Sequence, residues 1–231
     1  MDEQEPMTTL STRVWRNSLR AVLLLGVLLF ACAWTWRYWQ AWVYVGIYGI
    51  AVCINTAYFL RRGPALLQRR LLAGPGAETT LAQRVIQAVA GFCLLGIFVL
   101  AGLDHRWGWS SVPASIVLAG DGLLVLGLLL VFATFLHNSY AASTVEVVPK
   151  QAVAAGGPYA WVRHPMYLGS GMAFLATPAA LGSAWAWLAA VPAVLTLALR
   201  LLDEEQLLKQ QLPGYAAYCM RVRFRLVPLI W

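Results

Sequence analysis

The chain alternates long apolar stretches with short polar ones, and the apolar stretches have the length that a lipid bilayer requires. A helix of about 20 apolar residues crosses a hydrocarbon core of roughly 30 Å. Six stretches fit this length, approximately residues 19–36, 41–60, 85–103, 114–136, 166–182 and 183–202. The pattern predicts an all-α integral membrane protein with about six transmembrane helices.

The composition supports the same class. Hydrophobic residues make up 60% of the chain and charged residues only 12%, and the mean hydropathy is +0.66. Soluble domains contain about 25% charged residues, so this composition excludes an ordinary soluble fold. We interpret residues 1–231 as a single membrane domain, with four N-terminal spans in 1–136 and the polar motifs in 137–231. The first eighteen residues are polar, so we expect the first apolar stretch to be retained as a span.

The net charge of +7 is explained by membrane sidedness, and no nucleic-acid partner is needed to account for it. With six spans and a cytoplasmic N terminus, fifteen of the 17 Lys and Arg residues lie on the cytoplasmic side, and only Arg37 and Arg106 lie outside. Cytoplasmic loops of membrane proteins carry this excess of basic residues. We therefore expect both termini in the cytoplasm. The composition is compatible with a bacterial source, for which the location is the inner membrane.

The last two predicted spans differ from the first four. Gly182 and Ser183 leave almost no loop between them, and Pro178 and Pro192 interrupt their sequences. We expect a tight helical hairpin here, continued beyond residue 205 as a helix that Pro213-Gly214 ends. The basic tail that follows is expected to lie at the level of the lipid head groups.

A polar, turn-rich block at residues 156–169 contains the first group of candidate functional residues. His164 and Pro165 stand where the fifth span should begin, because proline suits the first turn of a helix. The free N–H groups of such a turn are a natural anchor for a carboxylate. Tyr159, Arg163 and Tyr167 lie within a few residues, so we predict a cytoplasmic ligand site.

A second polar cluster follows the hairpin and contains Arg200, Asp203, Glu204 and Glu205. Arg200 and Glu204 are four residues apart and share one helix face. A simple intrahelical ion pair explains that spacing without any function. A ligand site explains it as well, because charged groups at a membrane face are costly unless they are paired or solvated, and they count as functional candidates.

The four cysteines and Asp121 do not form a pattern that indicates a functional site. Cys32, Cys53, Cys93 and Cys219 have neither metal-ligand nor redox spacing, and we interpret all four as structural. Asp121 lies within the fourth predicted span, remote from both polar clusters, and we assign it a structural role. We expect no metal ion in this protein.

Together the polar motifs resemble those of the isoprenylcysteine carboxyl methyltransferase family. The shared pattern is Gly-Pro-Tyr-x-x-x-Arg-His-Pro-x-Tyr-x-Gly at 157–169, Arg-x-x-x-Glu-Glu-x-x-Leu at 200–208, and Pro-Gly-Tyr-x-x-Tyr at 213–218. The resemblance covers about the last 85 residues. It implies a membrane methyltransferase that takes a methyl group from S-adenosyl-L-methionine, bound in a cytoplasmic C-terminal region, and gives it to a lipophilic acceptor from the bilayer.

The resemblance also implies roles for individual residues. His164, Pro165 and Tyr167 resemble the cofactor-binding loop, with Tyr159 before it, and Glu204 resembles the carboxylate that holds the cofactor. Arg200 resembles the residue that meets the acceptor's carboxylate, and Arg163 and Glu205 support the site. The family usually has His-x-Leu-Val where this chain has Gln151, Ala152, Val153 and Ala154. The family's side-chain contact from the first position of this cofactor-lining stretch is therefore not expected, whereas its backbone contacts are.

Several functions remain open at this point. Within methyl transfer, the acceptor is a lipid-like carboxylate, as in isoprenylcysteine, an amine such as a phospholipid head group, or a thiol. From other classes, a membrane reductase that uses a nicotinamide cofactor fits the helical hairpin architecture, and a non-catalytic membrane scaffold would bind neither cofactor. Binding of S-adenosylmethionine distinguishes a methyltransferase from a reductase or a scaffold.

Overall fold

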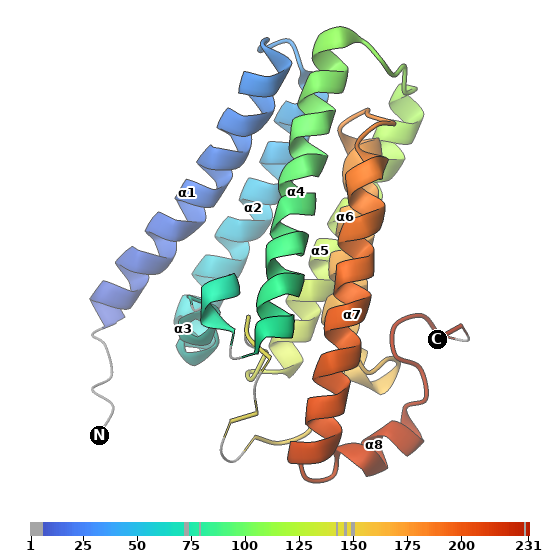
Figure 1. Ribbon diagram of the computed structural model, residues 1–231. Coiled ribbons are helices and arrows are strands. Elements are labelled where there is room, and N and C mark those ends of the chain that lie inside the picture. The colour runs from blue at the N-terminus through green and yellow to red at the C-terminus, as the bar shows by residue number, and fades with distance from the viewer. Residues whose placement is uncertain are drawn as a thin grey trace.

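The computed structural model of the protein describes residues 7–71, 74–78, 80–141, 143–145, 147–148, 151–228 and 230–231. These residues form a helical bundle without strands (Figure 1). The α-helices are α1 Met7–Ala33, α2 Trp39–Arg62, α3 Pro64–Leu71, α4 Leu81–Trp107, α5 Ala114–His137, α6 Pro165–Ala180, α7 Trp187–Gln211 and α8 Tyr215–Arg221. Two short 3₁₀ helices, η1 Pro75–Ala77 and η2 Gly157–Ala160, lie in the connections. The predicted all-helical class is confirmed.

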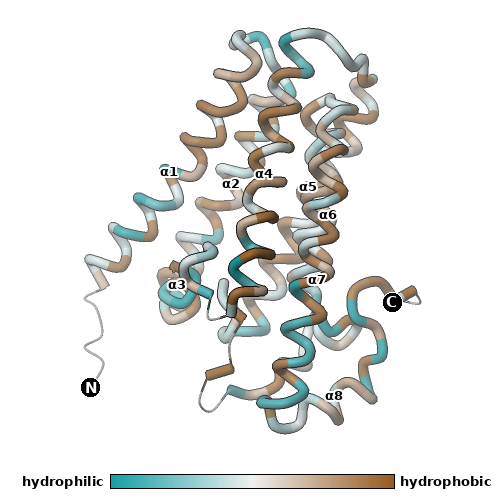
Figure 2. Tube along the Cα trace, in the orientation of Figure 1, coloured by the Kyte–Doolittle hydropathy of each residue, from teal (hydrophilic) through white to brown (hydrophobic). Residues whose placement is uncertain are grey.

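Four of the described helices, α1, α2, α4 and α5, are long and apolar enough to cross a membrane. They correspond to the first four predicted spans, and apolar residues dominate their length (Figure 2). The protein is therefore an integral membrane protein. Helix α6 has only 16 residues, and α7 ends in a charged segment, so the total of six spans stays a prediction.

Helix α1 begins at Met7, well before the predicted start at residue 19. Its polar first turns still bury Leu10 and Val14, which gives this segment an apolar face to pack. Farther along, the Ser18 and Thr56 hydroxyls are 3.0 Å apart and join α1 to α2. Hydropathy alone missed this extension because it averages the polar and apolar faces.

Helices α5 and α6 approach each other backbone to backbone. A Cβ atom added to Gly127 would lie 2.6 Å from the Gly169 carbonyl oxygen, and one on Gly169 would lie 2.7 Å from the Gly127 oxygen. Gly120 meets the Ala180 amide in the same way, at 2.5 Å. Small residues permit such close crossings of membrane helices. This contact fixes α6 along its whole length, and so it fixes the position of the residues at its N terminus.

The connection between α6 and α7 is held by a buried carboxylate. Asp104, at the end of α4, accepts hydrogen bonds from the Ser110 hydroxyl at 2.7 Å and the Ser183 hydroxyl at 2.5 Å. The Tyr38 hydroxyl donates to the Leu181 carbonyl oxygen at 2.7 Å. Gly182 has φ of 67°, a left-handed conformation that suits glycine. These bonds join three parts of the chain at the end of the bundle opposite the termini.

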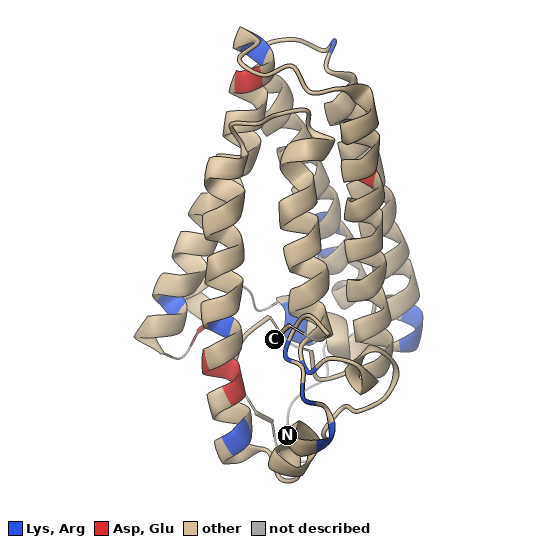
Figure 3. Cartoon of the chain, turned by 90° about the vertical axis from the view of Figure 1, so that its right-hand side faces the viewer, with Lys and Arg blue, Asp and Glu red and all other residues tan. Residues whose placement is uncertain are grey.

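Charged residues gather at the ends of the bundle, and most lie at the end that holds both termini, together with α3, α8 and the tail (Figure 3). Asp121 is an exception. It is buried within α5, and neither of its carboxylate oxygens has a hydrogen-bond partner in the described part of the chain. The clustering agrees with the predicted sidedness, and the assignment of this end to the cytoplasm stays a prediction.

We expect Gly127→Ala to lower the free energy of unfolding by about 1–3 kcal/mol, because the added methyl group forces α5 and α6 apart. Gly122→Ala, in the same helix, is the matched control, since nothing lies within 4 Å of an added Cβ there. That change should be neutral or stabilising by up to about 1 kcal/mol. Denaturation in detergent, followed by circular dichroism, measures both. Equal effects of the two substitutions would contradict the close-packing argument.

Candidate functional site

A cavity of about 370 Å³ opens at the polar end of the bundle, between the α5–α6 connection, the end of α7 and α8. Its volume lies in the range of small-molecule sites, roughly 300–1,000 Å³. Most of the residues singled out in the sequence line it: Gln151, Ala152, Val153, Ala154, Tyr159, Arg163, His164, Tyr167, Arg200 and Glu204. Pro165 and Glu205 do not line it.

The N terminus of α6 forms one wall of the cavity. His164 precedes the helix and Pro165 is its first residue, as predicted from the sequence. The tail crosses this point, since the amides of Arg163 and His164 donate to the carbonyl oxygens of Phe224 and Arg225 at 2.9 and 3.0 Å. His164 is therefore held between the loop and the tail. Its side chain is only 5% exposed.

His164 is electrically neutral at physiological pH. Burial lowers its pKa to about 4, although the nearby Glu205 carboxylate acts in the opposite direction. The Tyr215 hydroxyl lies 3.4 Å from the His164 Nε2 atom. The ring thus offers the cavity a polar but uncharged surface.

Glu204 is the carboxylate that lines the cavity from α7. The Tyr167 hydroxyl donates to its Oε2 atom at 2.5 Å, which links α7 to the first turn of α6. Burial raises the pKa of Glu204, while the hydrogen bond from Tyr167 and the charge of Arg200 oppose that rise. Tyr159 lies nearby, and its hydroxyl accepts a hydrogen bond from the Asn138 side-chain amide at 2.8 Å.

Arg200 is held by residues far from it in the sequence. Its Nη2 atom lies 2.7 Å from the Glu78 Oε1 atom and donates to the Ser143 carbonyl oxygen at 2.6 Å. Its Nη1 atom donates to the Gln83 side-chain oxygen at 2.9 Å. Among the ion pairs of the described residues, Arg200 is paired with Glu78 and not with Glu204. The simple intrahelical pair is therefore not what the structure shows.

Glu205 does not line the cavity, and it binds the α5–α6 connection and the C-terminal tail to α7. Its carboxylate lies 2.8 Å from the Lys209 Nζ atom, 2.7 Å from the Arg225 Nε atom and 3.4 Å from the Arg163 Nη2 atom. Burial opposes ionisation of Glu205, but the hydrogen bonds from Lys209 and Arg225 outweigh it and lower its pKa. The ionised Glu205 carboxylate thus joins α7 to Arg163 and Arg225, next to the cavity.

Sequence reasoning missed several residues of the cavity. Tyr215 and Tyr218 line it from α8, and the Tyr218 hydroxyl donates to the Tyr159 carbonyl oxygen at 2.7 Å. The Pro-Gly-Tyr-x-x-Tyr motif at 213–218, which contains both tyrosines, could have identified them. Glu78, the partner of Arg200, carried a weaker signal as an acidic residue in a basic loop. Gln151 lines the cavity, and its side-chain oxygen accepts a hydrogen bond from the Val148 amide at 3.1 Å.

Residues 115–213 match the model of the phospholipid methyltransferase family. The matched segment is less than half of the chain, and it runs from α5 through α6 and α7, the helices that carry Tyr167 and Glu204. Its N-terminal boundary excludes α1–α4. Phospholipid methyltransferases are membrane enzymes related to the isoprenylcysteine carboxyl methyltransferases. A search of curated proteins gives no match.

The buried His164 is expected to make the protein less stable in acid. The unfolded chain takes up a proton near pH 6.5, whereas the folded protein does so only near pH 4. Because the folded-state pKa is the lower one, stability falls as the pH drops through this window, by about 2 to 3 kcal/mol at pH 4.5.

Denaturation of the wild type and His164→Asn at pH 7 and pH 4.5 measures this contribution. The wild type should lose more stability than His164→Asn between the two pH values. Carboxylates remote from His164 act in both proteins alike, so their effect cancels in the comparison. An equal loss in both proteins would show that His164 is not held neutral by burial.

Proposed function

We propose that the protein transfers a methyl group from S-adenosylmethionine to a lipophilic acceptor that reaches the site from the bilayer. The observation that carries this proposal is the pairing of Glu204 with Tyr167 at the N terminus of α6, within a cavity of small-molecule size. Both residues fall in the segment that matches a family of membrane methyltransferases.

The residues of the cavity fit the charges of S-adenosylmethionine. Glu204 is a carboxylate suited to the positive ammonium or sulfonium group. The amides of Met166 and Tyr167 lie in the first turn of α6, where a helix has no internal acceptor, so they suit the carboxylate of the amino acid part. Tyr159, Tyr215 and Tyr218 supply aromatic surface for the adenine ring or the sulfonium. The neutral His164 adds no positive charge that would repel the sulfonium.

When bound, S-adenosylmethionine supplies an electrophilic methyl group on a positively charged sulfur. A lone pair of the acceptor forms the new bond to the methyl carbon while the carbon–sulfur bond breaks and its electron pair stays on sulfur. The contribution of the protein is alignment and exclusion of water, which can account for a large part of a displacement reaction's rate. The Tyr167 hydrogen bond and the Glu205 ion pairs hold the walls of the cavity in place for this purpose.

Two acceptor chemistries fit the site. The motifs that resemble isoprenylcysteine carboxyl methyltransferases favour a lipid-like carboxylate, which becomes a methyl ester with no proton to remove. The match to phospholipid methyltransferases favours an amine head group, which must attack as the neutral amine and releases a proton afterwards. The pairing of Arg200 with Glu78 also favours the second chemistry, because Arg200 already has a carboxylate partner.

Calorimetric binding of S-adenosylmethionine to the detergent-purified protein tests the proposal. We expect saturable binding by the wild type, weakened about tenfold to a hundredfold in Glu204→Gln because a charge-assisted contact is lost. Asp121→Asn removes a carboxylate that lies outside the cavity, and it should bind like the wild type. A folded wild type that binds reduced nicotinamide dinucleotide instead, or neither compound, would overturn the proposal in favour of a reductase or a scaffold.

The pH dependence of the methylation rate separates the two acceptor chemistries. With an amine acceptor, the rate should rise with pH through the titration of the amine, because only the neutral form attacks. With a carboxylate acceptor, the rate should be level above about pH 6, since the carboxylate is already ionised there. Initial rates of methyl transfer from labelled S-adenosylmethionine, measured on each candidate lipid between pH 6 and 9, provide the comparison.

A further inference from the structure

A second cavity, of about 740 Å³, lies within the membrane part of the bundle between α1, α2, α4, α5 and α6. Its walls are mostly aliphatic and aromatic, with Leu24, Phe98 and Leu128 among them. Arg70, Val131 and Ser170 line this apolar cavity and also the polar cavity described above. The two cavities therefore adjoin at these three residues.

Arg70 carries a positive charge at this junction. It belongs to α3, and the centre of its guanidinium lies 4.4 Å from the centre of the Phe135 ring. Its Nη1 atom is 3.3 Å from the Ala141 carbonyl oxygen and 3.9 Å from the Met166 sulfur. Burial lowers the pKa of Arg70 to about 10, so the side chain remains charged at neutral pH.

Arg70 differs from the other two cations that line the polar cavity. Arg200 is paired with Glu78 at 2.7 Å, and Arg163 with Glu205 at 3.4 Å. No acidic side chain of the described residues forms an ion pair with Arg70. Arg70 is only partly exposed, and a partly desolvated charge without an opposite charge is unfavourable, so an anionic ligand at this junction would stabilise it.

We propose that Arg70 binds the anionic group of the methyl acceptor, whose apolar chain occupies the 740 Å³ cavity. The proposal rests on the methyltransferase function above and specifies its substrate as an apolar chain that ends in a carboxylate or a phosphodiester. A guanidinium matches the paired oxygens of either group. The apolar walls on one side and the charge at the junction define an amphipathic ligand, with its head turned toward the polar cavity.

The position of Arg70 brings such a head group close to the methyl donor site. Arg70 contacts Met166, which precedes Tyr167, and Tyr167 donates its hydroxyl hydrogen to Glu204. An anion bound at Arg70 thus lies beside the first turn of α6. This arrangement assigns head-group recognition to Arg70 and leaves Arg200 to its internal partner Glu78.

Binding of three labelled lipids to the full-length protein in micelles of dodecyl maltoside, a detergent without a phosphate or carboxylate group, tests this assignment. The probes are a dansyl-labelled undecanoic acid, its methyl ester, and a phosphatidylethanolamine that carries the same dansyl-labelled chain. The wild type should prefer the acid to its ester at least tenfold. Arg70→Gln should weaken binding of the acid at least tenfold and change binding of the ester less than twofold. Binding of S-adenosylmethionine should also change less than twofold.

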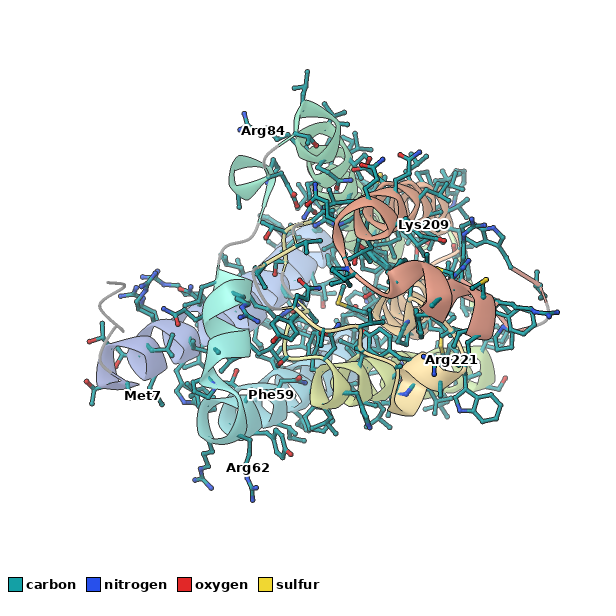
Figure 4. The ribbon with its side chains drawn as sticks, turned by 90° about the horizontal axis from the view of Figure 1, so that it is seen from below. Met7, Phe59, Arg62, Arg84, Lys209 and Arg221 are labelled. Atoms are coloured by element: carbon teal, nitrogen blue, oxygen red, sulfur yellow. The ribbon has the colours of Figure 1, made fainter. Side chains whose placement is uncertain are left out.

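Arg62→Gln is the matched control, because Arg62 projects outward from the end of α2, away from the bundle (Figure 4). It removes the same charge without touching either cavity and should leave all binding unchanged. If Arg70→Gln proves unstable, Arg70→Lys keeps the charge and should retain a preference for the acid. The phosphatidylethanolamine probe shows which source of anion is bound, since its loss of binding in Arg70→Gln identifies a phosphodiester.

An unchanged preference for the acid in folded Arg70→Gln would overturn the assignment, as would a wild type that does not discriminate between acid and ester. Loss of the preference in Arg70→Lys to the same extent as in Arg70→Gln would also contradict it, because a charged group would then be insufficient. These outcomes are independent of the proposed function, which fails instead if the wild type does not bind S-adenosylmethionine.

Discussion

The candidate site depends on the close approach of α5 and α6. At Gly127 and Gly169 the two backbones meet so closely that an added methyl group would collide with a carbonyl oxygen. Helix α6 is short, with 16 residues, so a contact along its length fixes its N terminus as well. Tyr167 is thereby placed beside Glu204 of α7, with His164 next to it on the cavity wall. A loosened crossing would separate the Tyr167 hydroxyl from Glu204.

Around this frame, charges are neutralised by partners from distant parts of the chain. Glu205 of α7 is joined to Arg163 of the loop and Arg225 of the tail, and Glu78 before α4 is joined to Arg200. The Glu205 pairs join the loop and the tail to α7, and the Glu78 pair joins the segment before α4 to α7. Buried pairs of this kind add little net stability, but the loss of one partner leaves an expensive unpaired charge. These ion pairs therefore favour a single arrangement of the segments at the polar end of the bundle.

The sequence was sufficient for the features that depend on local pattern. Apolar length identified α1, α2, α4 and α5, and the His164-Pro165 pair located the start of α6. Motif spacing selected residues that share one cavity. The partner of Arg200 could not be found this way, because a four-residue spacing favours Glu204 while the actual partner, Glu78, is brought in by the packing of α4 against α7. Position on a helix face restricts the choice of partners, and tertiary packing decides among them.

The two cavities are lined by different parts of the chain, the polar one mainly by residues after 130 and the apolar one mainly by α1, α2 and α4. Tyr167 and Glu204 lie within the segment that matches phospholipid methyltransferases, whereas Arg70 and most of the α1, α2 and α4 wall lie before it. Under the proposed function, the matched segment holds the methyl donor and the N-terminal helices shape the site of the acceptor. Selection for a new acceptor can then act on the N-terminal wall without disturbing Glu204 or the α5–α6 crossing. Under that proposal, most of the residues around the acceptor's chain lie outside the matched segment, while α5 and α6 complete the wall and Arg70 lies at the boundary between the two cavities.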